Sequence, residues 1–466
     1  MQRFPRTWDV LAGVSSAILA LACASGAAQF SLAEGVSAKA SAASQGAAQQ
    51  ASLVPERIIL TWNGDPRTTQ AVTWHTGTGV TRAVAEIARG DAGPGFPAKA
   101  DSVLASSQTL LTDAGPVCYH TACFSALEPG RRYVYRVGNG NTWSEWFQFR
   151  TAPDKPERFC FLYFGDAQND ICPMWSRVIR EAYSDSPRAS FMIHAGDLVN
   201  RGDADAQWGE WFAAGHWVNA MVPSIPAAGN HEYRQAGDGQ RVITAHWRAQ
   251  FALPDNGPAG LEETCYSLVY QNLRIVVLNS NSQITAQAEW LDQVLRKNRS
   301  LWVVCTFHHP IFSTAKQRDN PELRAAWKPV LDKYRVDLVL QGHDHTYGRT
   351  GLATPAADAE PAQNVSTGHN TRDARTGTVY VVSVSGPKMY NLNRKPFIVR
   401  AAEDTQLYQI ISIDGGTLEY EARTPAGDVY DAFILRKSPG QINELIERGG
   451  GEERLRGKEQ GGAERQ

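Results

Sequence analysis

Short segments of alternating apolar and polar residues fill the chain between Val54 and Thr151. The runs ERIILTW, TQAVTWHT, AVAEIARG and RRYVYRVGN are separated by Gly, Pro, Asn and Asp, and none of them sustains a helical period. This alternation is typical of antiparallel strands that bury one face and are bounded by turns. The pattern predicts a small all-β sandwich of the fibronectin III or immunoglobulin type over residues 54–152.

After Pro156 the pattern changes to continuous apolar runs that alternate with helical periodicity. The run RFCFLYF precedes MWSRVIREAY, whose apolar residues fall on one helix face, and further along WVVCTF precedes the amphipathic ELRAAWKPVLDKY. Continuous apolar runs are typical of strands covered on both faces. We therefore expect an α/β domain over residues 157–436.

The two ends of the chain differ from the predicted domains. Residues 1–28 place arginines before an apolar stretch and small residues after it, which is the layout of a signal peptide. Residues 29–53 are small and polar and predict a flexible linker, and the charged, Gly-rich residues 437–466 predict a disordered tail. We expect export to the periplasm or secretion, with lipid attachment at Cys23 as a lesser alternative. No later apolar run is long enough for a transmembrane segment in the mature chain.

Charge and cysteine content refine this picture. The 46 Lys and Arg against 48 Asp and Glu leave a formal charge of −2, so the broad positive field of a nucleic-acid binder is missing and no stable nucleic-acid partner is expected. Among the cysteines after the signal peptide, Cys118 and Cys123 could form a disulfide within a hairpin or remain free thiols. No CxxC spacing occurs, which disfavours a thiolate zinc site. The oligomeric state is left open.

Polar clusters follow five apolar stretches of the predicted α/β domain. They read GDAQND, GDLVNRGD, GNHEY, HHP and GHDH. Because ligands bind outside the carboxyl ends of the strands in α/β sheets, we expect these clusters to meet at one rim. Their oxygen and imidazole donors are Asp166, Asp197, Asn230, His308, His343 and His345.

This donor set predicts a site for two metal ions. Carboxylate, amide and imidazole groups suit Mn, Fe and Zn. Two aspartates and three histidines exceed what a single catalytic zinc ion needs while it keeps an open position. Two cations about 3.5 to 4 Å apart can share a hydroxide that attacks phosphorus and can neutralise the charge that builds on a phosphoryl group. The expected substrate is therefore a phosphate ester.

The order of these motifs resembles that of the calcineurin-like metallophosphoesterase superfamily. The preceding segments RIILTWNGDPRTTQAVTWHT and YRVGNGNTWSEWFQFRTAP resemble the N-terminal module of purple acid phosphatases. The resemblance implies a four-layer αββα metallophosphoesterase sandwich behind a fibronectin III-like domain. It also implies a bimetal centre and an acid phosphatase-like phosphomonoesterase activity.

The resemblance further implies a role for each candidate residue. Asp197 would bridge the two metals. The other ligands would divide into Asp166 and His345 on the first metal and Asn230, His308 and His343 on the second. His231 would steady the phosphoryl oxygens or protonate the leaving alkoxide, which is a general-acid role that imidazole can fill.

Two positions depart from the family patterns. Asn200 stands where purple enzymes carry a tyrosine ligand, and Gln168 stands where the wider superfamily uses a histidine. Either residue could supply a neutral oxygen to the first metal, or water could fill the gap, so we expect weaker binding of the first metal and no purple colour. In the loop after HHP, Lys316 and Arg318 could contact phosphate.

Two alternatives to a phosphomonoesterase stay open. The same metal centre could serve a phosphodiesterase or nucleotidase, because substrate choice lies in loops that the sequence does not decode. The chain could also be a secreted binding protein with a degenerate phosphoesterase domain, which the depleted first metal position favours and the full set of remaining ligands disfavours.

Overall fold

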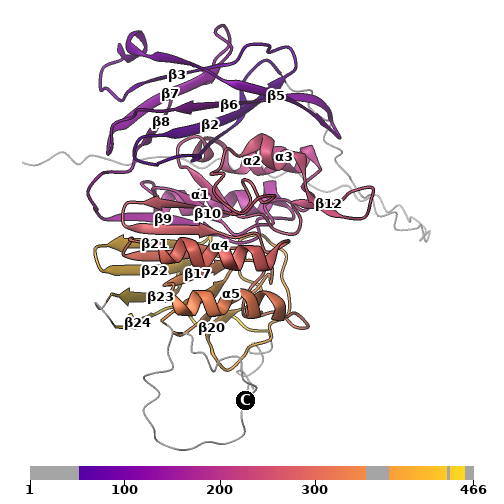
Figure 1. Ribbon diagram of the computed structural model, residues 1–466, viewed down its shortest axis with the longest axis vertical. Helices are drawn as coiled ribbons and strands as arrows, with labels where there is room; N and C mark the ends of the chain where they lie inside the picture. Colours follow the sequence, from indigo (N-terminus) through magenta and orange to yellow (C-terminus); the bar gives the residue numbers. More distant parts are fainter. Residues whose placement is uncertain (1–51, 353–376, 438–440, 457–466) are drawn as a thin grey trace, which may run out of the picture. The chain divides into compact units, whose positions relative to one another are not determined.

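The computed structural model describes residues 52–352, 377–437 and 441–456 (Figure 1). The predicted signal peptide (1–28) and nearly all of the predicted linker (29–53) lie outside the described residues, as does the end of the predicted tail. None of the helices in the described ranges is long and apolar enough to cross a membrane.

The first folded unit is a sandwich of two antiparallel four-stranded sheets. One sheet has the order β1 (Glu56–Thr61), β2 (Gln70–Gly77), β6 (Gly115–Phe124) and β5 (Ser106–Thr112). The other has the order β4 (Asp101–Leu104), β3 (Val84–Arg89), β7 (Arg132–Gly138) and β8 (Phe147–Arg150). Apolar side chains from both sheets, among them Trp74, Ile87 and Tyr135, form a common core. The predicted all-β domain is confirmed.

The α/β domain is built on two mixed seven-stranded sheets. The first runs β11 (Ser224–Pro226), β10 (Met192–His194), β9 (Phe159–Phe164), β21 (Tyr408–Asp414), β22 (Thr417–Arg423), β23 (Val429–Arg436) and β24 (Glu444–Gly449). The second runs β14 (Tyr266–Tyr270), β15 (Leu273–Val277), β16 (Trp302–Thr306), β17 (Leu338–Gln341), β19 (Val379–Val382), β18 (Tyr347–Thr350) and β20 (Ile398–Ala402). Strands β9 to β11 are parallel, as are β15, β16, β17 and β19.

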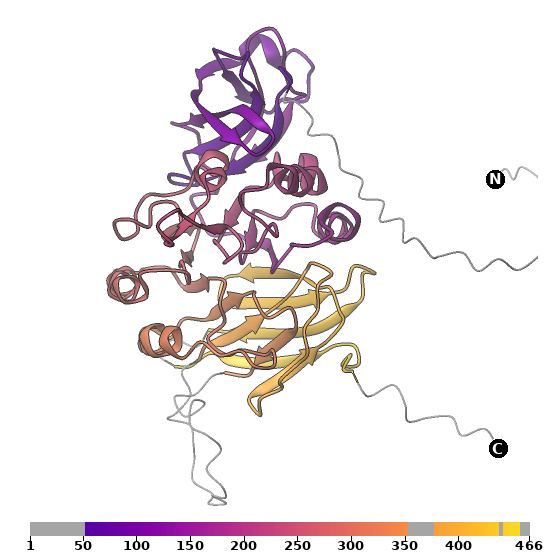
Figure 2. The same ribbon diagram turned by 90° about the vertical axis from the view of Figure 1, so that its right-hand side faces the viewer.

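Helices lie outside the two sheets. The helices are α1 (Ser176–Asp185), α2 (Asp205–Asn219), α3 (Ala245–Gln250), α4 (Ile284–Arg296) and α5 (Pro321–Lys333). The end of α1 is tied to the first sheet by a 2.6 Å hydrogen bond from Tyr408 to Asp185. Figure 2 shows α4 and α5 on the outer face of the second sheet, away from the first sheet. Leu291 and Trp327 from these helices share a core with Val339 of β17. The predicted α/β sandwich of two sheets with helices on the outside is confirmed.

The core between the two sheets explains why their strands read as continuous apolar runs. Phe161 from β9 and Leu418 from β22 are fully buried in the same cluster as Val304 from β16. Because the opposite faces of β9 and β16 are also covered, neither face tolerates a polar residue. In β9 (FCFLYF) and β16 (WVVCT), the only threonine, Thr306, therefore stands at the end of its strand, and the charged residues follow the strands.

One expectation from the sequence is wrong, and one open alternative is decided. The tail from residue 437 is not wholly disordered, because Glu444–Gly449 forms β24 and pairs antiparallel with β23. The alternating pattern of β24 is weak, and its partner strand stabilises it. Of the two alternatives left open for Cys118 and Cys123, the structure has free thiols, because both residues lie in β6, where their odd spacing points the side chains to opposite faces.

A buried ion pair joins β1 to α2. Both terminal nitrogens of Arg57 lie 2.7 Å from the two carboxylate oxygens of Asp205, and the side chains are only 11% and 8% exposed. Nε2 of His246 lies 3.3 Å from the same carboxylate. Burial raises the pKa of Asp205, but the hydrogen bonds and charges of His246 and Arg57 outweigh it, so the pKa falls well below 3.8.

We predict that Asp205→Asn lowers the free energy of unfolding by about 3 to 5 kcal/mol at pH 7, because it leaves Arg57 buried without a counter-ion. Urea unfolding followed by tryptophan fluorescence measures the loss. The folded pKa of Asp205 is depressed, so its contribution is complete above the ordinary value of 3.8 and disappears as the pH falls below it. The difference in the free energy of unfolding between the wild type and Asp205→Asn should therefore become smaller below pH 3.8.

The control is Asp65→Asn, which breaks the exposed pair with Arg67, whose side chains are 49% and 41% exposed. Exposed pairs contribute less than about 1 kcal/mol. Equal losses in the two variants would contradict the prediction.

Candidate metal centre

All six candidate ligands lie in loops that follow parallel strands, three in each sheet. The loops after β9, β10 and β11 carry Asp166, Asp197 and Asn230, and the loops after β16 and β17 carry His308, His343 and His345. The two sheets are packed together, so the carboxyl ends of these strands meet. The structure thus brings together six residues that span nearly 180 positions of the sequence.

The backbone of this site adopts an uncommon conformation. Asp166, Asp197, His343 and His345 have positive φ angles of 33°, 52°, 74° and 42°. Left-handed backbone costs a non-glycine residue about 1 to 2 kcal/mol. Such strain persists only where the surroundings fix it, and it is concentrated here in four of the six candidate ligands.

Two glycines allow the carboxylates to lie against neighbouring backbone. A Cβ atom on Gly229 would lie 2.1 Å from Oδ1 of Asp197, and one on Gly342 would lie 2.2 Å from Oδ2 of Asp166. The glycines of GNHE and GHDH are therefore required by close approach.

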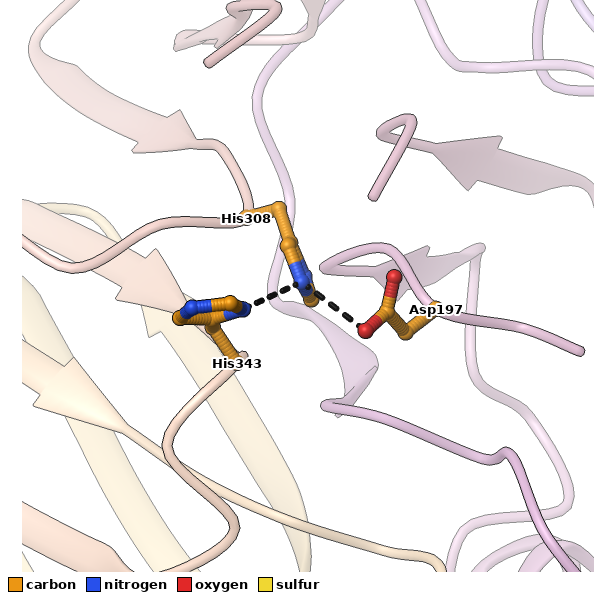
Figure 3. A group of neighbouring side chains, drawn as sticks. All are labelled: Asp197, His308 and His343. Atoms are coloured by element: carbon orange, nitrogen blue, oxygen red, sulfur yellow. Dashed lines mark hydrogen bonds and ion pairs between the residues drawn. The ribbon is translucent and has the colours of Figure 1, made fainter. Parts of the chain in front are cut away.

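The first group of side chains centres on His308 (Figure 3). Its Nδ1 donates to the backbone carbonyl of Ala195 at 2.9 Å, so in the neutral ring Nε2 carries a lone pair. This Nε2 lies 3.0 Å from Oδ2 of Asp197, 3.1 Å from Oδ1 of Asn230 and 3.1 Å from Nδ1 of His343. Atoms so close together require a hydrogen on one of the imidazole nitrogens or a cation between them.

The electrostatics of this group agree with that requirement. Burial lowers the pKa of His308, but the charge of Asp197 and its hydrogen bond outweigh burial and raise the pKa to about 9. The pKa of Asp197 is well below its usual range, because His308 more than offsets the effect of burial. Burial and the charge of His308 lower the pKa of His343. The group therefore holds a negative carboxylate next to a neutral His343.

His309 does not join this group. Its Nδ1 lies 2.8 Å from the hydroxyl of Ser280, and its ring packs against that of His343 with centroids 4.2 Å apart. Of the two adjacent histidines in HHP, His308 is the one directed at Asp197 and Asn230.

The second group consists of Asp166, Asp197 and His345, whose ligand atoms all lie within 4.8 Å of one another. Nδ1 of His345 donates to the carbonyl of Lys388 at 2.9 Å, so in the neutral ring Nε2 offers a lone pair, and it lies 3.4 Å from Oδ1 of Asp166. That oxygen is buried and has no hydrogen-bond partner among the described residues. Because Asp197 belongs to both groups, it is placed to bridge two cations.

Gln168 lies inside the second group. Its Nε2 is 2.9 Å from Nε2 of His345 and 3.1 Å from Oδ2 of Asp197, and the residue is 1% exposed. The side chain of Asn200 contacts Asn169 instead, and its Oδ1 accepts a hydrogen bond from Nδ2 of Asn169 at 3.2 Å.

His231 lies beside the carboxylate of Asp197, which both groups share. Its backbone N–H donates to Oδ1 of Asp197 at 2.9 Å, and its Nδ1 donates to the carbonyl of Asn200 at 2.6 Å. Nε2 then lies 3.8 Å from Oδ2 of Asp197, and the side chain is 28% exposed. Asn200 thus acts through its backbone by fixing the ring of His231.

Sequence reasoning missed Glu232, the acidic residue of GNHE. Its fully buried carboxylate accepts the backbone N–H groups of Asp197, Leu198 and Gly229 at 2.7 to 2.9 Å. Burial and repulsion from Asp197 raise the pKa of Glu232 to about 8, although these N–H groups favour the charged form. Glu232 fixes the loop that carries the bridging carboxylate, and its place in the motif was the available signal.

Sequence reasoning also missed Arg241, which lies on the hairpin of β12 (Tyr233–Gln235) and β13 (Arg241–Ile243). Arg241 donates to the carbonyl of Asn230 at 2.7 Å, and Arg318 donates to that of His343 at 3.3 Å. Two guanidinium groups are thus fixed on the backbone of two candidate ligands. Lys316 is exposed, and only its backbone contact with Asn391 is defined.

Comparison with known proteins shows a similarity to phosphoesterases in both folded parts of the chain. Residues 55–151 match the purple acid phosphatase N-terminal domain, and residues 161–347 match the calcineurin-like phosphoesterase family. The chain is 29% identical to the uncharacterized protein Rv2577 of Mycobacterium tuberculosis over 374 residues, which cover 71% of this chain and 69% of that protein. It is 26% identical to acid phosphatase type 7 of Mus musculus over 346 residues, covering 66% and 73% of the two chains.

A solved structure shares the fold. Purple acid phosphatase PPD1 from yellow lupin (Lupinus luteus) seeds superimposes with a TM-score of 0.67 at 20% identity, covering 82% of this chain and 74% of that one. At this identity the likeness concerns the fold alone.

We predict that Glu232→Ala destabilises the protein by about 2 kcal/mol or more, because it leaves buried N–H groups without an acceptor. It should also loosen the loop of Asp197 and reduce the amount of zinc retained after gel filtration. Urea unfolding and elemental analysis measure the two effects. The control is Glu262→Ala. In the wild type, the carboxylate of Glu262 also accepts a backbone N–H group, that of Gly260, but it does not contact a candidate ligand, so its removal should leave the zinc content unchanged. Unaltered stability and zinc content in Glu232→Ala would contradict the assigned role.

Proposed function

Because the chain belongs to the purple acid phosphatase-like calcineurin-type phosphoesterases, we propose that it hydrolyses phosphate monoesters in a metal-dependent reaction of the acid phosphatase type. The observation that carries the proposal is that two groups of ligand atoms share the carboxylate of Asp197. A shared carboxylate is the feature that distinguishes a dinuclear site from two separate ones.

The residues present fit two metal ions. Asp166 offers a buried oxygen without a hydrogen-bond partner among the described residues, and the ligand atoms of Asp197, Asn230 and His343 converge on Nε2 of His308. Asp166, Asp197 and His345 would hold the first ion, and Asp197, Asn230, His308 and His343 the second. Iron, zinc and manganese suit these donors. When bound, such ions would supply Lewis acidity at a phosphoryl group and lower the pKa of water.

The open side of the site has the groups that ester cleavage requires. Asn230 and His343 are half-buried, whereas Asp166 and His345 are buried, so a substrate approaches the second position from solvent. Nε2 of His231 lies 3.8 Å from Oδ2 of Asp197 on a partly exposed side chain, and the ring is fixed by the hydrogen bond from Nδ1 to the carbonyl of Asn200. A protonated His231 would give its Nε2 proton to the leaving alkoxide.

Arg318 and Arg241 would orient the phosphoryl oxygens, with Lys316 adding charge at the rim. Each arginine donates one terminal N–H group to a backbone carbonyl, and its guanidinium group has further N–H donors for a substrate. Arg241 has no carboxylate within ion-pair distance in the part of the chain that the structure describes, and Arg318 has only the distant Asp344 at 3.9 Å. Such unneutralised guanidinium groups suit an anionic substrate.

The first test is hydrolysis of p-nitrophenyl phosphate and bis-p-nitrophenyl phosphate with Mn, Zn or Fe added. We expect release from the monoester, whereas release from the diester alone would favour a phosphodiesterase. No turnover and no bound metal would favour a degenerate binding protein.

We predict that Asp197→Asn reduces kcat/KM for p-nitrophenyl phosphate at least about 100-fold while the protein stays folded, because a neutral amide bridges two cations poorly. Circular dichroism checks the fold. Asp203→Asn serves as the control, since Asp203 lies in the same loop but pairs with Arg201 on the surface. Retained turnover in Asp197→Asn would refute the assignment.

We predict that Arg241→Gln and Arg318→Gln each raise KM for p-nitrophenyl phosphate about 10-fold with a smaller change in kcat, since each removes a charge-assisted donor to the substrate. Arg299→Gln is the matched control, because Arg299 is an exposed arginine that also donates to a backbone carbonyl, that of Asn298. If all three variants gave the same KM, neither rim arginine would contact the substrate.

A further inference from the structure

Gln168 presents hydrogen-bond donors where a metal site needs lone pairs. Its Nε2 lies within hydrogen-bond distance of Nε2 of His345, at 2.9 Å, and of Oδ2 of Asp197, at 3.1 Å. The bond from Nδ1 of His345 to Lys388 leaves Nε2 of the neutral ring as an acceptor, and the carboxylate oxygen is an acceptor as well. The two N–H bonds of one carboxamide therefore match the two acceptors one to one.

The other end of the same amide is unsatisfied. Oε1 of Gln168 is buried and has no hydrogen-bond partner among the described residues, and the same holds for Oδ1 of Asp166. Buried polar atoms are nearly always paired, so each exception requires an explanation. The amide of Gln168 therefore has an oxygen without a hydrogen-bond partner among the described residues, next to the nitrogen that contacts Asp197 and His345.

We propose that the carboxamide of Gln168 takes the place of the first metal ion in the metal-free protein. With its nitrogen directed inward, it links Asp197 to His345 by two hydrogen bonds. Rotation by half a turn about the last side-chain bond exchanges the nitrogen for Oε1, which is a neutral oxygen ligand. The first ion then binds only when these two hydrogen bonds break.

The two metal positions are unequal for this reason. Around His308 the neighbouring groups are acceptors, and within the described residues no side-chain N–H of an amide fills the space between them as Gln168 does at the first position. A cation at the second position therefore replaces only contacts among its own candidate ligands, whereas the first ion must also displace the two N–H donors of Gln168. A merely absent ligand would weaken the first ion but would give the metal-free protein no added stability.

The decisive variant is Gln168→Glu, which keeps the size of the side chain but has no N–H donor and always offers oxygen. Calorimetric titration with Mn²⁺ should show two steps in the wild type, with the weak step at least about 100-fold weaker than the tight one. Gln168→Glu should strengthen the weak step about 10-fold or more and change the tight step less than about threefold. This measurement needs no substrate, although the proposal rests on the proposed function in taking the two groups as metal sites.

A second arm measures thermal unfolding without metal. Gln168→Met and Gln168→Glu should both lower the melting temperature of the chelator-treated protein by about 3 °C or more, since both lose the bridging donors. Saturating Mn²⁺ should remove the deficit of Gln168→Glu. Gln70→Met is the matched control, because Gln70 is also 1% exposed and donates twice, to Thr61 and Ala71, so its deficit should be the same with and without Mn²⁺.

Two results would overturn the proposal. One is two Mn²⁺ steps of equal affinity in the wild type, and the other is a Gln168→Glu protein whose weak step and metal-free melting temperature are both unchanged. If the wild type binds no Mn²⁺ at all, the proposed function fails instead. The metal-free melting temperature of Gln168→Met then still decides whether the amide links Asp197 to His345.

Discussion

The buried carboxylate of Asp197 is the constraint on which the rest of the site depends. It is 1% exposed and carries a charge that burial alone would remove, so positive or donating groups must surround it. His308, in a loop of the second sheet, supplies positive charge. His231 and Gln168, in loops of the first sheet, supply N–H donors. These contacts are also what place the carboxylate between the two groups of ligand atoms. The compensation of one buried charge thus determines the geometry of the centre.

The carboxylate of Asp197 is held in place by a strained backbone, and the buried Glu232 stabilises that backbone conformation. Asp197 has a φ of 52°, and its own N–H is directed to Glu232 rather than to a strand partner. The carboxylate of Glu232 also accepts the backbone N–H of Gly229. Because Gly229 has no side chain, the carboxylate of Asp197 can lie directly against its backbone. The loops of GDLVN and GNHE are therefore one unit joined by a single carboxylate. Two motifs that look independent in the sequence are one structural element.

Much of the fold and the convergence of the six candidate ligands could be predicted from the sequence, because both depend on strong local patterns. Continuous apolar runs that end in Asp, Asn or His place those residues at strand ends whatever the remaining structure does. Relations between distant residues could not be predicted in the same way. The pairing of Glu444–Gly449 with β23, the direction of the Gln168 amide and the anchoring of Arg241 on Asn230 each depend on a partner far along the chain. Cys118 and Cys123 show the converse, since their closeness in sequence suggested a hairpin where one strand runs through both.

Each candidate metal position joins the two sheets of the sandwich. At one position Asp197 and Asn230 of the first sheet face His308 and His343 of the second, and at the other Asp166 and Asp197 face His345. Acidic and amide oxygens thus come from one sheet and imidazoles from the other, so neither sheet alone balances the charge at its strand ends. A bound cation, a proton on His308 or the amide of Gln168 serves the same purpose of holding opposed acceptors together. Because these groups fill the seam between the sheets, what occupies the centre affects the packing of the domain as well as its chemistry.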